Sequence, residues 1–507
     1  MGGVTWQSFI ESPHEGYWDQ SMLSDLLESN WFADILVTPG HWRADSAHLV
    51  NEWLEENGPA LVLISSDEEG HCPFWRVNAP VWKMTPDLSL AHRPDRAIPL
   101  GYTPHTRPTL KSLGIPLEKK GWTFSGQVTN SRRHSAMEAL RKLGDPLETD
   151  TFAAGLGPEE YIKTLWDAEW VPCPAGNVRP ETFRMWEALE AGAVPILDAT
   201  SPHGDQDYWP FILGDHPLPV VADWSRVGEL LSAPAPLTGA AVWYSGFKRK
   251  WKRDLWNAWA DLVGEEPWVD PVKRITTIIT ASPIPSHPGF EILSETVESV
   301  RERLDGEIIV AFDGPHPGDD KEVYEEHIRR VAYYANLHWP EVWVWYTAEW
   351  KHQAATVRDI LPHLYPEYAA VLMMEHDTPL TGEIPFPRLT EILYEGKFDS
   401  IRFHHESQIP PEHAYLMNGT WQGEGFDVVR TNQFSARPHL ALSGFYKGLM
   451  GQLPQDARTF IEDWAYGKVE NAPWDHHKLG IYHPTGDIKR SYHLDGRAGA
   501  PKREFSW

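Results

Sequence analysis

A buried strand that ends in two carboxylates sets the strongest constraint on the fold of this chain. Residues 369–374 form an uninterrupted apolar run, and Glu375 and Asp377 follow it with one residue between them. Such a run is typical of a strand that is covered on both faces. Carboxylates at its end supply the oxygen ligands that Mg²⁺ and Mn²⁺ prefer. The triplet alone is a weak signal in an acidic sequence, because a solvated loop at a strand end has the same composition.

The sequence before this triplet alternates between strands and helices. A run rich in β-branched residues at 274–281 predicts a strand, and the Pro-rich segment 282–289 predicts the loop that ends it. The apolar spacing predicts a helix over 290–304, and 307–313 predicts a second buried strand. A strand, a helix and a strand of these lengths form a right-handed parallel unit with its ligand site beyond the carboxyl ends of the strands.

Asp313 closes the second of these strands, so we expect it to lie at the same sheet edge as Glu375 and Asp377. The intervening residues predict a helix near 321–335, a strand at 342–346 and a helix that opens at His352 and Gln353. A second acidic pair, Glu462 and Asp463, lies among apolar residues further along the chain.

With this order of motifs, residues 274–465 resemble the nucleotide-sugar transferases of the GT-A fold, particularly their large inverting family. The resemblance implies that Ser282, Asp313 and Gln353 contact the donor nucleotide. It also implies that Glu375 and Asp377 bind a metal ion and the diphosphate, with His493, or else His483, as a late ligand. Glu462 or Asp463 would be the general base. The triplet starts with Glu and has His376 in its middle, which leaves metal dependence open.

The chemistry of sugar transfer explains why two separate acidic sites occur together. A metal ion neutralises the leaving diphosphate, and a base deprotonates the incoming hydroxyl if the anomeric centre is inverted. A glycoside hydrolase also uses two carboxylates, but it has no need of diphosphate-binding strand ends. Hydrolysis is therefore the less economical interpretation.

The N-terminal half predicts a separate α/β unit. Residues 33–38 and 60–65 predict buried strands, and 46–57 predict the helix between them. The Pro- and Thr-rich segment 93–113 is interpreted as a crossover rather than a core element. A second α/β lobe is expected over about 118–240.

In that second lobe, residues 171–196 predict a strand, a Pro/Gly loop, a helix that starts at 180–182 and ends at Gly192, and another strand. The free N–H groups at the start of such a helix can bind an anion. The segment resembles the donor-binding lobe of GT-B glycosyltransferases, most closely the exostosin branch. The resemblance assigns four residues to the donor: Arg132, Thr182, Arg184 and Glu187. An ordinary helix with a Gly stop is the simpler alternative.

The net charge of −27 disfavours nucleic acid as a partner. The basic cluster 248–253 is interpreted as the solvated face of a helix over 247–262, with Trp251, Leu255, Trp256 and Trp259 facing inward. Two cysteines and the lack of a signal sequence or an 18-residue apolar run predict a cytoplasmic protein without membrane insertion, in the host cytoplasm if it is encoded by a bacteriophage.

The expected fold is therefore α/β, with a GT-B-like pair of Rossmann-type lobes at 1–117 and 118–270 and a GT-A domain with a mixed, mainly parallel sheet at 271–507. The expected function is a hexosyltransferase that uses Mn²⁺ or Mg²⁺ and a nucleotide-sugar donor, with a UDP-sugar as first choice, and a protein or glycan as acceptor. For the N-terminal half two interpretations stay open: a second donor site, or a lobe that has lost activity and serves only to bind an acceptor. Three alternatives remain open: a DNA-modifying glycosyltransferase acting on hydroxymethylated bases, a non-catalytic glycan-binding or virion protein, and a glycoside hydrolase.

Overall fold

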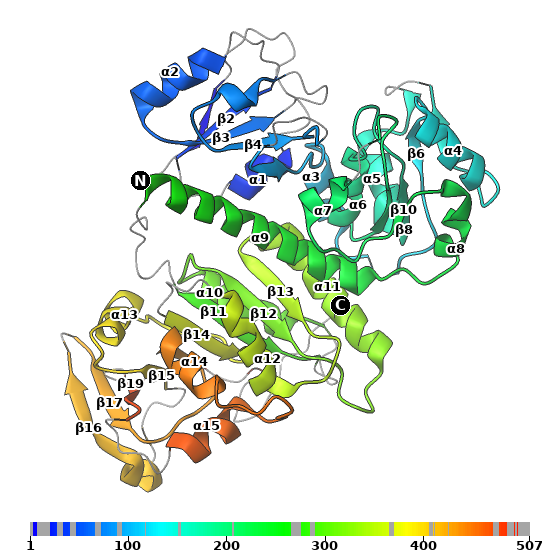
Figure 1. Ribbon diagram of the computed structural model, residues 1–507. Coiled ribbons are helices and arrows are strands. Elements are labelled where there is room, and N and C mark those ends of the chain that lie inside the picture. Colours follow the sequence, from blue (N-terminus) through cyan, green and yellow to red (C-terminus); the bar gives the residue numbers. More distant parts are fainter. Residues whose placement is uncertain are drawn as a thin grey trace. The chain divides into compact units, whose positions relative to one another are not determined.

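The computed structural model divides the chain into two compact units (Figure 1). The first unit comprises Met1–Trp268 and Ala332–His338, and the second comprises Val269–Val331 and Trp339–Trp507. The structure describes residues 4–7, 21–27, 34–40, 47–65, 72–88, 94–116, 118–150, 154–204, 207–264, 275–283, 289–364, 370–404, 409, 411–423, 425–469, 476–483, 491 and 494.

A five-stranded parallel sheet forms the first lobe of the first unit, with its strands in chain order. The strands are β1 (Val4–Trp6), β2 (Ile35–Pro39), β3 (Leu61–Ser65), β4 (Val81–Met84) and β5 (Arg96–Ile98), and α1 (Ser21–Leu27) and α2 (Ala47–Asn57) connect the first three. Every residue of β3 is buried, as expected for an inner parallel strand. The predicted strands near 33–38 and 60–65 and the helix between them are confirmed.

The segment 93–113 is not a plain crossover, and that prediction was wrong. Its first part forms β5, which pairs with β4, and its second part forms α3 (Thr106–Leu113). Pro108 lies within the first turn of α3, where its missing N–H has no intrahelical partner to lose. The proline therefore marks the start of a helix rather than its absence.

The second lobe of the first unit contains shorter parallel strands. The structure has β6 (Ser125–Gln127) beside β7 (Leu147–Thr149), and β8 (Trp170–Cys173), β9 (Val194–Asp198) and β10 (Val220–Val221) in a second ladder. An isolated parallel bridge links Trp122, three residues before β6, to Trp170 of β8. The helices are α4 (Ser131–Leu140), α5 (Pro158–Asp167), α6 (Phe183–Glu190), α7 (Tyr208–Leu213) and α8 (Val227–Leu231).

The long helix α9 (Leu237–Val263) follows the second lobe. The residues that it buries agree only in part with the prediction. Trp251, Leu255 and Trp259 are buried as expected, whereas Trp256 is half-buried. Lys248 was expected on the solvated face, and this was wrong: its ammonium donates a 3.0 Å hydrogen bond to Glu190, which is fully buried. A buried carboxylate requires such a partner.

The second unit is built on one nine-stranded sheet in the order β13-β12-β11-β14-β18-β15-β19-β17-β16 (Figure 1). Its strands are β11 (Thr276–Ala281), β12 (Ile308–Phe312), β13 (Val342–Tyr346), β14 (Ala370–Glu375), β15 (Ser400–Phe403), β16 (Met417–Gln422), β17 (Asp427–Thr431), β18 (His439–Leu442) and β19 (Leu479–His483). The sheet is mixed, as predicted, but it is not mainly parallel. Four of its eight strand pairings are parallel. Three of these four join the strands β13, β12, β11 and β14 into one parallel block.

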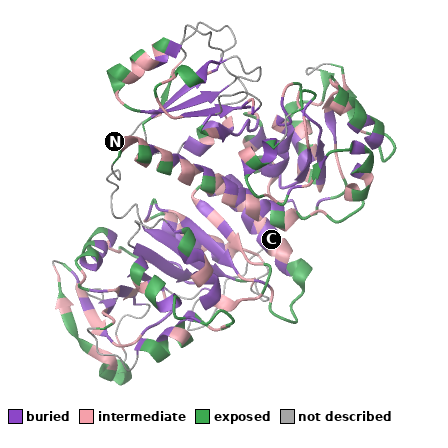
Figure 2. Cartoon of the chain, in the orientation of Figure 1, coloured by how far each residue is buried: buried purple, intermediate pink, exposed green. Residues whose placement is uncertain are grey.

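Helices cover this sheet and confirm the predicted helical segments. They are α10 (Glu291–Arg301), α11 (Lys321–His338), α12 (His352–Ile360), α13 (Phe386–Tyr394), α14 (Ser443–Met450) and α15 (Ile461–Val469). On one face, α12, α14 and α15 share a hydrophobic core with β11, β12, β14 and β18. Figure 2 shows these strands as buried. No helix among the described residues is long and apolar enough to cross a membrane.

Candidate active site

The carboxyl ends of β11, β12 and β14 bring two of the predicted acids to one edge and one face of the sheet. Thr280 of β11 pairs with Glu375 of β14 and with Ala311 of β12. Side chains alternate along a strand, so Asp313, two residues after Ala311, continues the same face. This is the face that carries Ile278, Ile309 and Met373 into the core beneath α12 and α15. The structure therefore places Asp313 and Glu375 at the same sheet edge, on two strands that are separated by β11.

The side chain of Gln353, in the first turn of α12, connects three parts of this edge. Its Nε2 donates to Thr280 Oγ1 at 3.0 Å and to Glu375 Oε1 at 3.2 Å. Its Oε1 accepts from the backbone N–H of Ile461 at 3.1 Å, at the start of α15. A single amide thus fixes the carboxylate of Glu375 and the first turn of the helix that carries the second acidic pair.

His352 holds the other carboxylate from an unusual backbone conformation. Its φ is +70°, in the left-handed region that non-glycine residues rarely adopt, and its N–H donates to Asp313 Oδ2 at 2.9 Å. Its ring packs edge-on against Phe460, with 4.4 Å between the ring centroids. Backbone strain of this kind persists where surrounding contacts enforce it, and it is common at functional sites. Two consecutive residues therefore hydrogen-bond to the two carboxylates: His352 to Asp313 and Gln353 to Glu375.

The environment of Asp313 favours its protonated form more than water does. Burial raises the pKa of Asp313, and the hydrogen bonds from the His352 N–H and from Tyr324 Oη, at 3.3 Å, oppose that shift. The next residue, Gly314, is required by close packing, because a Cβ there would lie 2.2 Å from the carbonyl carbon of Glu349. Tyr324 was not predicted, since it is contributed by a helix whose period alone gives no reason to single it out.

The two carboxylates of the acid-x-acid triplet have different surroundings. Glu375 is half-buried at the end of β14, whereas Asp377 is only 2 % exposed and its carbonyl accepts from the N–H of Leu494 at 2.9 Å. The N–H of His376 donates to Thr280 O at 3.0 Å, which ties the triplet to β11. In the described part of the chain, no group of three or more His, Cys, Asp or Glu side chains is placed to hold a metal ion. His493 lies outside the described residues.

Glu462 and Asp463 lie in the first turn of α15, and both are exposed. Negative side chains are favourable there because the N-terminus of a helix carries partial positive charge. Ile461, immediately before them, is the residue that Gln353 anchors. Ser282, the third residue assigned to the donor nucleotide, is exposed in the loop after β11.

Two arginines at the same edge were missed by the sequence interpretation. Arg402 of β15 pairs with His439 of β18, and Arg437 precedes His439 by two residues. Burial lowers the pKa of Arg402 to about 10, the positive charge of Arg437 lowers it further, and the negative charge of Glu462 opposes the shift. Nothing in the local sequence distinguishes these arginines from ordinary surface cations, because only the strand pairing brings them to the acidic edge.

In the first unit, the N-terminus of α6 carries buried polar groups that have no hydrogen-bond partner in the described part of the chain. Thr182 precedes the helix, and Arg184 donates from Nη2 to Ser125 O at 2.7 Å while its guanidinium lies 4.4 Å from the ring centroid of Phe124. Thr182 Oγ1 and Arg184 Nε and Nη1 are buried and have no hydrogen-bond partner among the described residues. A Cβ at Gly126 would lie 2.1 Å from Arg184 Nη2, so the glycine makes room for the guanidinium.

The two other predicted donor residues of this unit are engaged in internal hydrogen bonds. Arg132 Nε donates to Asp198 Oδ1 at 3.0 Å. Glu187 accepts from Thr103 Oγ1 at 2.9 Å and from Tyr161 Oη at 3.0 Å. Burial raises the pKa of Glu187, and these hydrogen bonds oppose the shift.

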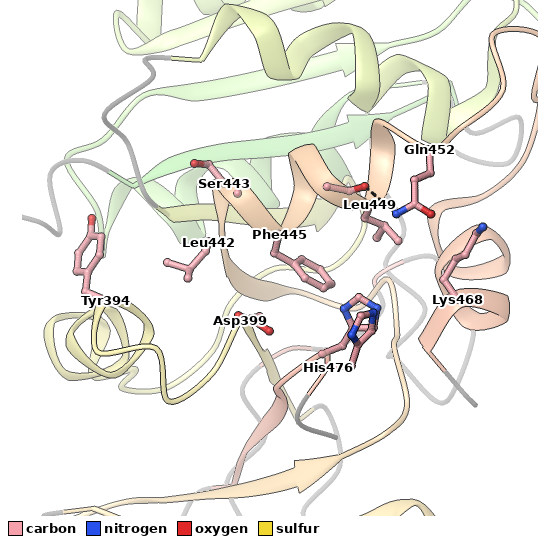
Figure 3. Close-up of a pocket in the computed structure, with 12 residues that line it drawn as sticks. Tyr394, Asp399, Leu442, Ser443, Phe445, Leu449, Gln452, Lys468 and His476 are labelled. Carbon is pink, nitrogen blue, oxygen red and sulfur yellow. Dashed lines mark hydrogen bonds between the residues drawn. The ribbon is translucent and has the colours of Figure 1, made fainter. Parts of the chain in front are cut away.

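A cavity of about 720 Å³ lies in the second unit near the amino end of β14, away from the carboxyl end that carries Glu375. Figure 3 shows Phe445 and Leu449 of α14 beside His476 and Lys468 in this cavity. Leu442, which also lines it, pairs with Ala370 at the start of β14, whereas Glu375 ends that strand. None of the predicted site residues is among the described residues that line it.

No protein-family model matches this sequence, and no curated protein matches it either. Among solved structures, GalNAc-T7 with UDP, GalNAc and Mn²⁺ matches 43 % of this chain and 45 % of its own, with 11 % identity and a TM-score of 0.31. The chain thus spans less than half of the GalNAc-T7 chain. The mannosyltransferase PcManGT from Pyrobaculum calidifontis, in complex with GDP-Man and Mn²⁺, matches 52 % of this chain and 68 % of its own, with 13 % identity and a TM-score of 0.29. Mouse xyloside xylosyltransferase 1 matches 39 % and 81 %, with 11 % identity and a TM-score of 0.22.

Proposed function

We propose that the second unit is a glycosyltransferase that moves a sugar from a nucleotide-sugar donor to a hydroxyl group of a protein or glycan acceptor. One observation carries the proposal: Gln353 joins Glu375, at the end of a parallel strand, to the first turn of α15, where Glu462 and Asp463 lie. A carboxylate for a cation and a carboxylate for an acceptor are then held at a fixed separation, as an inverting transfer requires.

Glu375 and Asp377 are the residues that would hold Mn²⁺ or Mg²⁺. Mg²⁺ commonly takes one or two protein carboxylates and completes its octahedron with water and substrate phosphate oxygens, so a two-carboxylate site fits this chemistry. The half-buried Glu375 carboxylate fits the position of such a ligand better than the 2 % exposed Asp377. When bound, the ion would neutralise charge on the departing diphosphate.

Glu462 or Asp463 would accept the proton of the acceptor hydroxyl while the oxygen of that hydroxyl forms a bond to the anomeric carbon of the donor sugar. The bond from that carbon to the diphosphate oxygen breaks in the same step, and the nucleoside diphosphate leaves with its electron pair. Both carboxylates are exposed in the first turn of α15, where an acceptor can reach them. Asp313, with its raised pKa, fits a hydrogen-bonding role toward the donor nucleotide.

A second site in the first unit is favoured by the buried groups at the start of α6. Thr182 Oγ1 and two guanidinium nitrogens of Arg184 are buried and without partners in the described chain. Unpaired buried donors are costly, and a phosphate at this helix start would satisfy them. This supports the exostosin-like donor site, in which Arg132 and Glu187 would act through the contacts that they already make.

The test is a panel of UDP-, GDP- and TDP-sugars, each assayed for release of nucleoside diphosphate with Mn²⁺, with Mg²⁺ and with EDTA. Glu375→Gln is expected to lower metal-dependent turnover at least about a hundredfold, because it removes the charge that attracts the cation. Glu383→Gln is the matched control, since Glu383 is exposed in the loop that follows.

Each alternative gives its own result in this panel. Sugar release from a glycan without any nucleotide donor would replace the proposal with a hydrolase. Turnover that requires DNA with hydroxymethylated bases as acceptor would assign the DNA-modifying activity. Binding of glycans with no turnover of any donor would leave a binding protein.

The first-unit site is tested separately by donor binding to Arg184→Gln. We expect nucleoside-diphosphate affinity at that site to fall about tenfold or more, the effect of losing charge-assisted hydrogen bonds. Arg141→Gln is the control, because Arg141 is exposed and pairs with Glu148 at the surface. Unchanged affinity in Arg184→Gln would contradict a donor site in this unit.

A further inference from the structure

The cavity beside α14 has the size of a small-molecule site and is partly lined by glycine. Its volume is about 720 Å³, and such sites commonly enclose roughly 300–1,000 Å³. Gly444 and Gly448 lie one turn apart on α14, and both line the cavity. A Cβ at either position would meet no atom from elsewhere in the described chain within 4 Å.

Neither the backbone conformation nor the packing of the chain explains these two glycines. Neither Gly444 nor Gly448 has a positive φ, and both have open space where a Cβ would lie. Glycine weakens a helix, so positions of this kind normally carry a residue with a side chain. Glycine is favoured where a ligand approaches the backbone closely, and such a ligand accounts for both positions.

Phe445, which follows the first of these glycines, gives the cavity a rigid apolar wall. One face of its ring is stacked on the buried Phe434, with 6.3 Å between the ring centroids. The ring of His477 packs edge-on against it, with 6.0 Å between the centroids. Figure 3 shows Phe445 extending from α14 toward His476. An aromatic ring that is fixed in this way presents a flat apolar surface to a ligand.

Three polar side chains with unused hydrogen-bonding capacity also line the cavity. Ser443 is only 6 % exposed, and its hydroxyl has no hydrogen-bond partner in the described part of the chain. Asp399 accepts from the N–H of Lys478 at 2.9 Å through Oδ2, whereas its Oδ1 receives no hydrogen bond from a described residue. The ring nitrogens of His477 likewise have no partner within the described ranges. A ligand with hydroxyl groups would satisfy all three side chains.

The charges around the cavity favour an uncharged ligand. Asp399 contributes a carboxylate and Lys468 of α15 an ammonium, so an ion of either sign meets one like charge. Burial lowers the pKa of His477, the neighbouring His476 lowers it further, and the charge of Asp399 opposes the shift. The His477 ring is therefore neutral at pH 7, and a neutral imidazole both donates and accepts. A purely apolar ligand would leave these polar groups without partners.

We propose that this cavity binds a saccharide unit of a glycan acceptor, away from the unit that receives the new sugar; the acceptor assignment rests on the proposed glycosyl transfer. Sugar hydroxyls both donate and accept, which matches a serine hydroxyl, a carboxylate oxygen and a neutral imidazole. The C–H groups on one face of a pyranose ring are apolar, which matches the ring of Phe445.

Helix α15 connects the cavity to the acidic edge. Glu462 and Asp463, the two candidates for the general base, lie in its first turn, and Lys468, which lines the cavity, lies in its last turn. A helix rises about 1.5 Å per residue, so these positions are roughly 8–9 Å apart along the axis. A glycan chain that is modified at the first turn can therefore extend along α15 and place a further sugar unit in the cavity.

The experiment measures binding of neutral disaccharides (maltose, cellobiose, mannobiose and diacetylchitobiose) and of inorganic phosphate to the full chain by calorimetry. We expect at least one disaccharide to bind, and Gly448→Leu, which fills the cavity, to weaken that binding at least about tenfold. The thermal midpoint of Gly448→Leu should be unchanged or higher, because leucine favours a helix more than glycine does. Gly467→Leu is the matched control, since Gly467 lies on α15 in equally open surroundings and does not line the cavity.

Asp399→Asn gives a second measure that does not depend on filling the cavity. The amide keeps an oxygen that can accept from Lys478 N but loses the charge, so disaccharide binding should weaken about tenfold. Binding of phosphate alone, or of none of these probes, would overturn the saccharide site. Disaccharide binding that persists in both Gly448→Leu and Asp399→Asn would overturn it as well, because the sugar would then lie elsewhere. A thermal midpoint of Gly448→Leu well below that of Gly467→Leu would contradict the open space beside Gly448.

Transfer kinetics test the acceptor assignment separately, with a longer oligosaccharide of the bound type as acceptor. Gly448→Leu should raise the KM for this acceptor at least about tenfold and leave the KM for the nucleotide sugar unchanged. An unchanged KM for the acceptor would overturn the assignment of the cavity to the acceptor. Disaccharide binding that is lost in Gly448→Leu, in a protein that turns over no donor, would uphold the saccharide site while refuting the transferase.

Discussion

Gln353 Nε2 lies 3.2 Å from Glu375 Oε1, so the first turn of α12 orients the carboxylate that ends β14. The same amide accepts from Ile461 N, and its nitrogen also donates to Thr280. An amide suits this position because it both donates and accepts. A carboxylate there could not donate to Glu375, and an ammonium could not accept from the helix start.

Gln353→Ala should therefore affect both stability and activity. The change leaves Thr280, Glu375 and Ile461 without this partner, which we expect to cost about 1–3 kcal/mol of unfolding free energy. Turnover should fall further than stability explains, because two separate parts of the site lose their shared anchor. Chemical denaturation and donor turnover are the measurements. Gln452→Ala, which removes an amide whose one hydrogen bond within the described part of the chain goes to Gly448 O, should change neither by much. Equal effects in both variants would contradict the anchoring role.

Glu462→Gln and Asp463→Asn separate the two candidates for the general base. The base variant should lose turnover by about 10²–10⁴-fold and keep its donor affinity, because proton removal from the acceptor is the only step affected. The other variant should stay close to the wild type, since both side chains are exposed and changes at exposed positions rarely alter stability. Steady-state kinetics with saturating donor distinguish them. Full activity in both variants would remove α15 from the mechanism.

His352→Gly and His352→Ala test whether the backbone at this position is strained. Glycine adopts a φ of +70° without the steric cost that alanine retains, so His352→Gly should be more stable than His352→Ala by about 1 kcal/mol. Ala355→Gly, in the regular part of α12, should show the usual loss of about 1 kcal/mol. Denaturation midpoints at one pH provide the comparison. If glycine were the worse residue at both positions, the left-handed conformation of His352 would be incorrect.

The parallel block of the second unit could be predicted from sequence because its signals are local. The β-branched run of β11, the alternation of strands and helices, and the apolar run before Glu375 each determine their own element. The lateral contacts could not be predicted in this way. Arg402 and Tyr324 reach the site through strand order and helix rotation, which involve residues far apart in the chain. The wrong prediction for 93–113 rested on the high Pro and Thr content of the segment, although a proline in the first turn, such as Pro108, is compatible with a helix.

His439 should make the second unit sensitive to mild acid. Its Nδ1 donates to Arg437 O, and its Nε2 accepts from the hydroxyl of Tyr446, so both nitrogens are used by the neutral ring in a buried position. Burial lowers its pKa from 6.5 to about 4. The folded state therefore binds a proton less readily than the unfolded state, and stability that is present above pH 6.5 is lost as the pH falls toward 4. This group alone should contribute a loss of about 3 kcal/mol between pH 7 and pH 4.

The measurement is the unfolding free energy of the wild type and of His439→Gln at several pH values between 7 and 4. The variant cannot take up this proton, so the difference between the two proteins should shrink by about 3 kcal/mol as the pH falls. The comparison of the two proteins isolates this effect. Carboxylates whose pKa is lowered also reduce the unfolding free energy as the pH falls, but they reduce it equally in both proteins. A difference that stays constant with pH would mean that His439 titrates alike in the folded and unfolded chains, and that its buried pairing with Tyr446 does not hold the ring neutral.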